Sequence, residues 1–230
     1  MLHSNEDLAK HQPVQLSVEQ LQERAKSITV KILSGESIGS GSIVDRQGST
    51  YTVITNQHVL RSAKPPYQIE TAQGQIYAAN LLPTVSFDEV DLSLLQFTSS
   101  ETSYEIASIG SFPDVGDRVF VAGFPLPKEA SQHEGFSFRT GKVSLVLDKA
   151  LQGGYSVGYT NYVEKGMSGG PLLNLCGEVV SINGMHAEPL WGDPYLYEDG
   201  SQPDLNLKQK MSRYSWGIPI ETYLQRIINK

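Results

Sequence analysis

Short apolar runs separated by Gly, Pro, Asn and Asp make up most of the hydrophobic pattern of this chain. From residue 28 onward these runs are rich in Val, Ile and Tyr, and little helical spacing interrupts them. Many short runs with such punctuation, without interleaved helices, are typical of an all-β sandwich or barrel. The predicted strands are residues 28–33, 42–44, 51–55, 75–79, 92–97, 118–122, 142–147, 155–158, 172–175, 178–182 and 214–218.

Helical patterns occur near the two ends of the chain. Ser17 and Gln20 match a capping box, and the apolar positions that follow predict a short helix to about Lys26. In residues 220–230 apolar side chains again recur at helical spacing, which predicts a closing helix.

The chain length of 230 residues and the strand pattern indicate two barrels of roughly six strands each. Gly, Ser and Pro cluster near the middle of the chain, so the first barrel and its helix are expected over residues 17–110 and the second barrel over residues 111–230. Residues 1–16 are polar and are expected to form a flexible leader. Residues 185–213 form a long polar insertion, and loops of that length are usually functional or disordered.

Composition and charge exclude several classes of function. A net charge of −7 argues against a nucleic-acid-binding surface, which needs a basic stripe. No apolar run approaches the roughly 18 residues of a membrane span. The first residues contain no apolar signal segment, so the protein is expected to be cytosolic or to have lost a leader. Cys176 is the single cysteine, which excludes an internal disulfide and a cysteine metal cluster.

One serine lies between glycines, in Gly166-Met167-Ser168-Gly169-Gly170-Pro171. Glycine permits positive φ and close backbone approach, so such a serine can be held exposed with backbone N–H groups beside it. A hydroxyl nucleophile needs this exposure, a base within reach and donors aimed at the oxyanion. Most glycine-bracketed serines only form turns, so the hypothesis requires a base elsewhere in the chain.

His58 and Asp91 are the candidates for the base and its orienting acid. Among the five histidines, His58 directly follows a predicted strand and has apolar residues on its far side. Asp91 adjoins a buried apolar run, where an acid is costly unless it is hydrogen-bonded. Taken alone, each has a plain alternative, a structural histidine and a turn-capping aspartate. Asp88 and Glu89 are nearby competitors in the polar turn.

The chain order His58, Asp91, Ser168 is the chymotrypsin order, which separates that class from subtilisin-like and α/β-hydrolase enzymes. Further motifs are Gly39-Ser40-Gly41-Ser42-Ile43-Val44, Thr55-Asn56-Gln57-His58-Val59, Asp91-Leu92-Ser93-Leu94-Leu95, Val115-Gly116-Asp117 leading to Gly123-Phe124-Pro125, Gly166 to Leu172, Gly177 to Asn183, and Gly217-Ile218-Pro219-Ile220. With these motifs the chain resembles the chymotrypsin-fold serine endopeptidases, and most of all the protease domain of the HtrA (DegP-like) branch. The resemblance runs in register from about residue 25 to the C-terminus.

The resemblance implies an all-β fold of two six-stranded antiparallel β-barrels with short terminal helices, and a serine endopeptidase without cofactor or metal. His58 would take the proton of the Ser168 hydroxyl, and Asp91 would orient His58. Backbone N–H groups of Gly166 and Ser168, on either side of Met167, would hold the oxyanion. The partner would be a peptide or unfolded protein. A periplasmic or secreted mature form is favoured, and the oligomeric state stays open.

The resemblance also indicates a specificity pocket. Its two walls would be Tyr162, Val163, Glu164 and Lys165 on one side, and Ile182, Asn183 and Gly184, pairing with the substrate backbone, on the other. Tyr162 stands where the trypsin branch has an aspartate, so an apolar substrate side chain is expected rather than Arg or Lys. Glu164 and Lys165 are expected to be solvated rim charges.

Three features depart from the family pattern. Met167 replaces a polar residue before the serine, so activation by a newly cut N-terminus is not expected. The chain ends without the PDZ domain that such proteins often carry, so peptide-gated activation through that domain is not expected either. Residues 185–213 have no family counterpart; a lid over the cleft is one interpretation, and a solvated acidic loop is favoured over a calcium site.

Two rival interpretations use the same residues. The G-x-S-x-G pattern around Ser168 also occurs in α/β-hydrolases, but that fold requires the order Ser, acid, His and a helix after the serine. Here a proline and an apolar strand follow, which excludes the esterase interpretation. The more serious alternative is a catalytically silent protease fold that binds peptides or unfolded protein.

Overall fold

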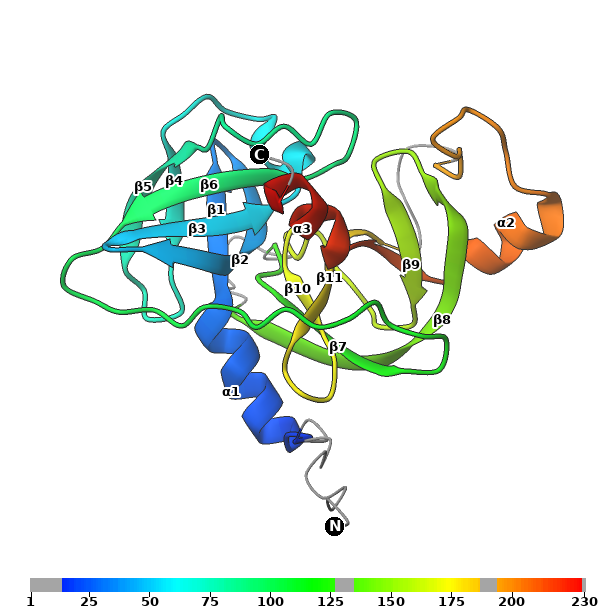
Figure 1. Ribbon diagram of the computed structural model, residues 1–230, viewed down its shortest axis with the longest axis horizontal. Coiled ribbons are helices and arrows are strands. Elements are labelled where there is room, and N and C mark those ends of the chain that lie inside the picture. The colour runs from blue at the N-terminus through cyan, green and yellow to red at the C-terminus, as the bar shows by residue number, and fades with distance from the viewer. Residues whose placement is uncertain (1–13, 127–134, 187–193, 229–230) are drawn as a thin grey trace, which may run out of the picture.

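Side chains that alternate between the inside and the outside of a sheet build the first barrel. The computed structural model describes residues 14–126, 135–186 and 194–228, and in it six antiparallel strands close in the order β1-β2-β3-β6-β5-β4 (Figure 1). Val30, Ile32, Val53 and Leu95 are buried in the core of this barrel. Its strands are β1 (Thr29–Ser34), β2 (Ser37–Gln47), β3 (Thr50–Thr55), β4 (Tyr67–Glu70), β5 (Ile76–Leu81) and β6 (Ser93–Thr98).

The second barrel repeats this architecture with later strands, in the order β10-β11-β12-β9-β8-β7. Val119, Val143, Val157 and Leu172 lie in its core. Its strands are β7 (Arg118–Gly123), β8 (Ser137–Leu151), β9 (Tyr155–Tyr159), β10 (Pro171–Leu173), β11 (Val179–Met185) and β12 (Ser215–Pro219). The predicted all-β fold of two six-stranded antiparallel barrels is therefore confirmed.

Strand β4 is the one that the sequence pattern did not predict. It has four residues, of which Tyr67 and Ile69 are buried and Gln68 is exposed. It pairs with β1 on one side and β5 on the other, so it closes the first barrel. Its alternation is a genuine strand signal, but a four-residue run directly after Pro65-Pro66 also fits a loop.

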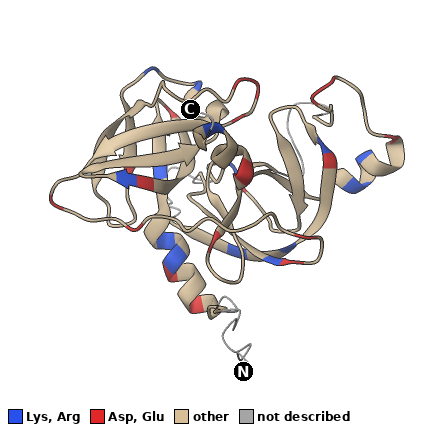
Figure 2. Ribbon diagram, viewed as in Figure 1, with Lys and Arg blue, Asp and Glu red and all other residues tan. Residues whose placement is uncertain are grey.

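The N-terminal helix α1 (Val18–Ile28) begins at the predicted capping box. The Ser17 hydroxyl accepts the Gln20 N–H at 3.2 Å, and the Gln20 side chain accepts the Ser17 N–H at 2.9 Å, which satisfies two otherwise unpaired helix donors. Leu21 and Ala25 are buried against the body of the protein. Charges of both signs follow one another along the helix (Figure 2).

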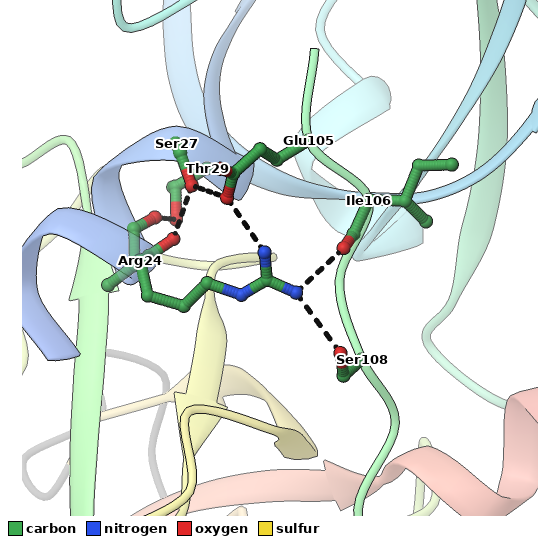
Figure 3. A network of polar contacts seen from close by, with 7 residues as sticks. Arg24, Ser27, Thr29, Glu105, Ile106 and Ser108 are labelled. Atoms are coloured by element: carbon green, nitrogen blue, oxygen red, sulfur yellow. Dashed lines mark hydrogen bonds and ion pairs between the residues drawn. The ribbon is translucent and has the colours of Figure 1, made fainter. Parts of the chain in front are cut away.

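A polar network fastens α1 to the segment that joins the two barrels (Figure 3). Arg24 pairs with Glu105 at 2.7 Å and donates to the Ile106 carbonyl at 2.9 Å and the Ser108 hydroxyl at 3.1 Å. Ser27 donates to the same Glu105 carboxylate at 2.7 Å. Because this segment runs between β6 and β7, the helix restrains the connection between the barrels.

The structure describes the insertion of residues 185–213 except for residues 187–193. Residues 194–213, its later described part, lie beside β8 and β9 and carry a short helix, α2 (Leu205–Met211), at the outer edge of the second barrel (Figure 1). Trp216 donates its indole N–H to the Met211 carbonyl at 3.2 Å, and Lys149 pairs with Asp199. The interpretation of the insertion as a lid stays a prediction, because residues 187–193 lie outside the described residues.

The C-terminal apolar spacing predicts a helix, and the structure has helix α3 (Ile220–Ile228) there. This helix lies where the two barrels meet (Figure 1). The expected flexible leader falls mostly outside the described residues. At its end, the Leu16 N–H donates to the Leu175 carbonyl at 2.9 Å. In the part of the chain that the structure describes, no helix has the length and apolar character of a membrane span.

Candidate functional site

The pairing of β3 with β6 brings His58 and Asp91 together. Thr55 at the end of β3 lies opposite Ser93 at the start of β6, so the residues just beyond these ends are neighbours. Both Asp91 carboxylate oxygens are used: one accepts the His58 backbone N–H at 2.8 Å, and the other bonds His58 Nδ1 at 2.6 Å. The Asn56 side chain donates to the Asp91 carbonyl at 2.9 Å. The imidazole is therefore fixed through Nδ1.

The protonation of this pair follows from the surroundings of Asp91. Burial raises the pKa of the Asp91 carboxyl. Hydrogen bonds from His58 and Tyr155, together with the His58 charge, lower it by more than burial raises it, so the pKa of Asp91 lies below its usual range. An ionised carboxylate can only accept hydrogen bonds. His58 Nδ1 therefore carries the proton, which leaves Nε2 as the basic nitrogen when the ring is neutral.

Ser168 lies in a turn of the second barrel between β9 and β10. Its hydroxyl donates to the Gly184 carbonyl at 3.2 Å and makes no hydrogen bond to His58 among the described residues. Gly184 lies between Ser168 and Asp91. A Cβ built on Gly184 would lie 2.4 Å from the Tyr155 hydroxyl, and this hydroxyl donates to Asp91. The three predicted residues thus belong to one cluster, although the serine and the histidine are not hydrogen-bonded.

Ser40, a fully buried residue of β2, fixes the turn before Ser168. Its hydroxyl donates to the Gly166 carbonyl and accepts the Phe124 N–H, both at 2.8 Å, and its N–H donates to the Ser168 carbonyl at 2.8 Å. The Lys165 carbonyl accepts the Leu126 N–H at 2.7 Å. These bonds turn the carbonyl groups of the segment toward the protein.

The N–H groups of the same turn divide into two kinds. The Met167 N–H donates to the Glu164 carbonyl at 3.1 Å. The N–H groups of Gly166 and Ser168 donate to no acceptor within residues 14–126, 135–186 and 194–228. Gly166 has a φ of +93°, which glycine adopts readily and other residues rarely do. The turn therefore leaves two donors, one on each side of Met167, without a partner among the described residues.

The predicted pocket residues lie in different environments. Tyr162 is exposed and Val163 is buried. Lys165 is exposed, as expected of a rim charge. The same expectation is wrong for Glu164, whose side chain is only 11% exposed and pairs with Arg139. The Arg139 guanidinium also lies over the Tyr162 ring, 5.1 Å from its centre.

The opposite wall is buried except at its end. Ile182 and Asn183 are fully buried, and Gly184 is the first partly exposed residue of the three. The Asn183 N–H and carbonyl bond Gly170 and Gly169, at 2.9 and 2.7 Å. The Asn183 amide donates to the Met167 carbonyl at 2.8 Å. Asn183 therefore supports the serine turn, and its own N–H and carbonyl are already hydrogen-bonded within the protein.

Sequence reasoning missed three residues of the site: Ser40, Arg139 and Tyr155. Ser40 was included only as part of a motif, and Tyr155 only as the start of a strand. Each acts through a side-chain contact with a residue distant in the chain, for which the spacing of residues gives no signal. In the described ranges, no group of three or more His, Cys, Asp or Glu side chains is arranged to hold a metal ion.

Comparison of the sequence with known proteins shows which family the chain is similar to. The trypsin-like peptidase domain matches residues 39–182, well over half of the chain. The "Serine protease Do-like HtrA" of Bacillus subtilis is 31% identical over 157 residues, which cover 64% of this chain and 33% of that protein. The "Periplasmic pH-dependent serine endoprotease DegQ" of Escherichia coli is 31% identical over 155 residues, covering 64% and 31%.

The solved structures add a match at the level of the fold. The serine endoprotease from Yersinia pestis covers 94% of this chain with a TM-score of 0.66 at 22% identity, and 67% of that protein is matched. The chain spans only about a third of the length of the two curated relatives. The family match, the two-barrel fold and the His–Asp pair beside a glycine-bracketed serine lead to one conclusion: this chain belongs to the trypsin-like peptidase family.

Proposed function

We propose that this chain is a serine endopeptidase that hydrolyses peptide bonds through His58, Asp91 and Ser168. The observation that carries the proposal is the His58–Asp91 pair, joined by two hydrogen bonds at 2.6 and 2.8 Å, in one cluster with the Ser168 turn. An ionised acid, an imidazole with a free Nε2 and a serine beside unpaired N–H groups are the parts that acyl transfer needs.

The first chemical step requires a rotation of the serine side chain. The Ser168 hydroxyl leaves the Gly184 carbonyl, a half-exposed bond of 3.2 Å, and turns toward His58 Nε2. His58 takes the hydroxyl proton as the oxygen attacks the substrate carbonyl, and Asp91 stabilises the imidazolium. His58 then gives the proton to the leaving amine. Water then attacks the acyl-enzyme while His58 takes one of its protons, and the ester bond breaks as His58 gives that proton back to the Ser168 oxygen, which releases the acid product.

The oxyanion that forms during the attack requires donors that are already oriented. The N–H groups of Gly166 and Ser168 serve this role, because the carbonyl of each peptide unit is held: the Lys165 carbonyl by the Leu126 N–H, and the Met167 carbonyl by the Asn183 side chain. Met167 lies between these two residues but does not donate to the oxyanion, because its N–H already donates to the Glu164 carbonyl.

Replacing Gly166 with alanine tests this assignment. A Cβ at this position would lie 2.5 Å from the Phe124 carbonyl oxygen and 2.7 Å from the Leu126 nitrogen, so the turn must move. We expect kcat to fall by about 10²–10³-fold, the usual cost of one oxyanion donor. The matched control is Gly116→Ala, which has a φ of +103° and nothing within 4 Å of the added Cβ. Equal peptidase activity in the two variants would contradict the assignment.

The pocket favours an apolar substrate side chain. Glu164, the acidic residue of the predicted wall, is paired with Arg139, so its charge is compensated. The exposed Tyr162 ring provides apolar surface, and Gly184 begins the stretch that pairs with the substrate backbone. The substrates are then peptides or unfolded protein chains with an apolar residue before the cleaved bond.

A fluorophosphonate probe distinguishes this function from a silent binding module. An activated serine attacks the phosphorus and releases fluoride, which leaves a stable adduct. We expect labelling at Ser168 in the wild-type chain, located by peptide mass spectrometry, and none after His58→Ala. The bond from Ser168 to Gly184, instead of to His58, is the observation that favours a silent module. Absence of labelling under all conditions would support that module and contradict the proposal.

A further inference from the structure

Tyr155 places a buried hydroxyl against the proposed catalytic acid. Its side chain belongs to the first residue of β9, and the residue is only 7% exposed. Its hydroxyl donates to Asp91 Oδ2 at 2.5 Å, the same oxygen that bonds His58 Nδ1. Asp91 Oδ1 accepts the His58 backbone N–H. The carboxylate is therefore held by three donors, and the Tyr155 hydroxyl is the donor from the second barrel.

The hairpin that carries Tyr155 also holds the backbone of the acid. The Asp91 N–H donates to the Gly153 carbonyl at 3.0 Å, in the turn between β8 and β9. A Cβ on Gly153 would lie 3.3 Å from the Asp91 Cβ, so the turn and the acid are in close contact. Asp91 is thus fixed by its own barrel through His58 and Asn56, and by the other barrel through Gly153 and Tyr155.

Gly184 leaves the space that the Tyr155 hydroxyl fills. A Cβ on Gly184 would lie 2.4 Å from this hydroxyl oxygen and 2.7 Å from the ring carbon Cε1. It would also lie 2.9 Å from the Asn56 side-chain oxygen. Any larger residue at position 184 would displace the phenol from Asp91. The glycine and the tyrosine therefore form a matched pair beside the acid.

The surroundings of the Tyr155 hydroxyl favour its protonated, donating form. Burial and the negative charge of Asp91 raise the pKa of Tyr155 well above its usual value. A protonated phenol beside an ionised carboxylate can only donate, and a hydrogen bond to a charged partner is stronger than one between neutral groups. Its removal leaves Asp91 Oδ2, in a largely buried place, with His58 as its one remaining partner.

We propose that Tyr155 is a positioning residue for Asp91, and that its hydroxyl holds the carboxylate in the orientation that His58 requires. This inference rests on the proposed peptidase function. Without the Tyr155 hydroxyl, the Asp91 carboxylate loses one of its hydrogen-bond donors and can rotate, so it orients the His58 imidazole less firmly. Tyr155 is buried, so substrate binding should not depend on its hydroxyl.

The test is Tyr155→Phe, which removes the hydroxyl and keeps the ring packed against Gly153. We expect kcat to fall about 10–100-fold, because the imidazole is less firmly oriented for proton transfer, which corresponds to about 1.4–2.7 kcal/mol at about 1.36 kcal/mol per tenfold in rate, while KM stays within about twofold. The matched control is Tyr77→Phe in the first barrel. There the hydroxyl bonds Ser99 and Tyr104, at 3.1 and 2.8 Å, so its loss affects stability without touching Asp91.

Kinetics on a chromogenic peptide and thermal melts of both variants separate the outcomes. A lower kcat for Tyr155→Phe than for Tyr77→Phe, at similar melting temperatures and KM, supports the inference. Equal kcat values, or a loss explained by the unfolded fraction, would overturn it. The proposed function fails separately, if the wild-type chain has no activity that depends on Ser168.

Discussion

Replacing Ser168 with alanine is expected to lower peptidase kcat by about 10⁴-fold or more, because the serine, histidine and acid act as one unit. The fold should survive the change. The hydroxyl makes a single half-exposed hydrogen bond, to the Gly184 carbonyl at 3.2 Å, and the bond from the Ser40 N–H to the Ser168 carbonyl does not involve the side chain. Initial rates on a fluorescent peptide and a thermal melt of each protein measure the two effects.

Ser99→Ala is the control for this experiment, as a serine that lies away from the site. Its hydroxyl donates to the Thr102 carbonyl at 2.8 Å and also bonds the Thr102 N–H and the Tyr77 hydroxyl, so this variant loses more hydrogen bonds than Ser168→Ala. Ser99 follows the end of β6 that lies opposite Thr50, whereas His58 and Asp91 adjoin the other end. We expect normal activity in this variant. If Ser168→Ala retained the wild-type rate, hydrolysis would have to come from another group and the proposed mechanism would be lost.

Much of the fold could be predicted because most of its strands carry their own local signal. The apolar runs that became β3 and β7 are bounded by turn residues, and the capping box before α1 has a direct hydrogen-bonding cause. The exceptions have weak local signals. β4 is four residues long, and α2 is a seven-residue helix within a polar stretch, where Asp204 accepting the Leu207 N–H is the main clue.

The candidate site could be predicted in its principal residues but not in its supporting contacts. His58, Asp91 and Ser168 stand in motifs whose order is informative. The contact between Tyr155 and Asp91 joins residues 64 apart, and the bond between Ser40 and Gly166 joins residues 126 apart. Such contacts depend on how two separate barrels meet.

Asp91→Asn is expected to lower kcat by about 10⁴-fold, with a smaller change in KM. One Asp91 oxygen faces the His58 backbone N–H and the other faces His58 Nδ1 and the Tyr155 hydroxyl, so every partner is a donor. An asparagine has one acceptor atom and one donor group there. Whichever way the amide is turned, its NH₂ meets a donor, and the simplest relief moves the imidazole proton to Nε2. His58 then cannot accept the serine proton.

The same substitution has a pH-dependent effect on stability. The folded-state pKa of Asp91 is below its usual range, despite burial that raises it, because of hydrogen bonds and charge from its partners. Its ionised form therefore stabilises the fold above about pH 4, the ordinary aspartate value, and this contribution is lost as the pH falls through the lower folded value. We expect the difference in urea midpoint between wild type and Asp91→Asn to be largest near neutrality and to shrink in strong acid.

Asp88→Asn is the control for both effects. Asp88 lies in the same loop, but its carboxylate is 60% exposed and pairs with Arg226 at 2.7 Å, a surface contact worth about 1 kcal/mol or less. We expect near-normal kcat for this variant. Comparable kcat losses in the two variants would mean that the loop as a whole, and not the Asp91 carboxylate, supports catalysis. A pH-independent difference in urea midpoint for Asp91→Asn would contradict an acid that is ionised through its contacts with His58 and Tyr155.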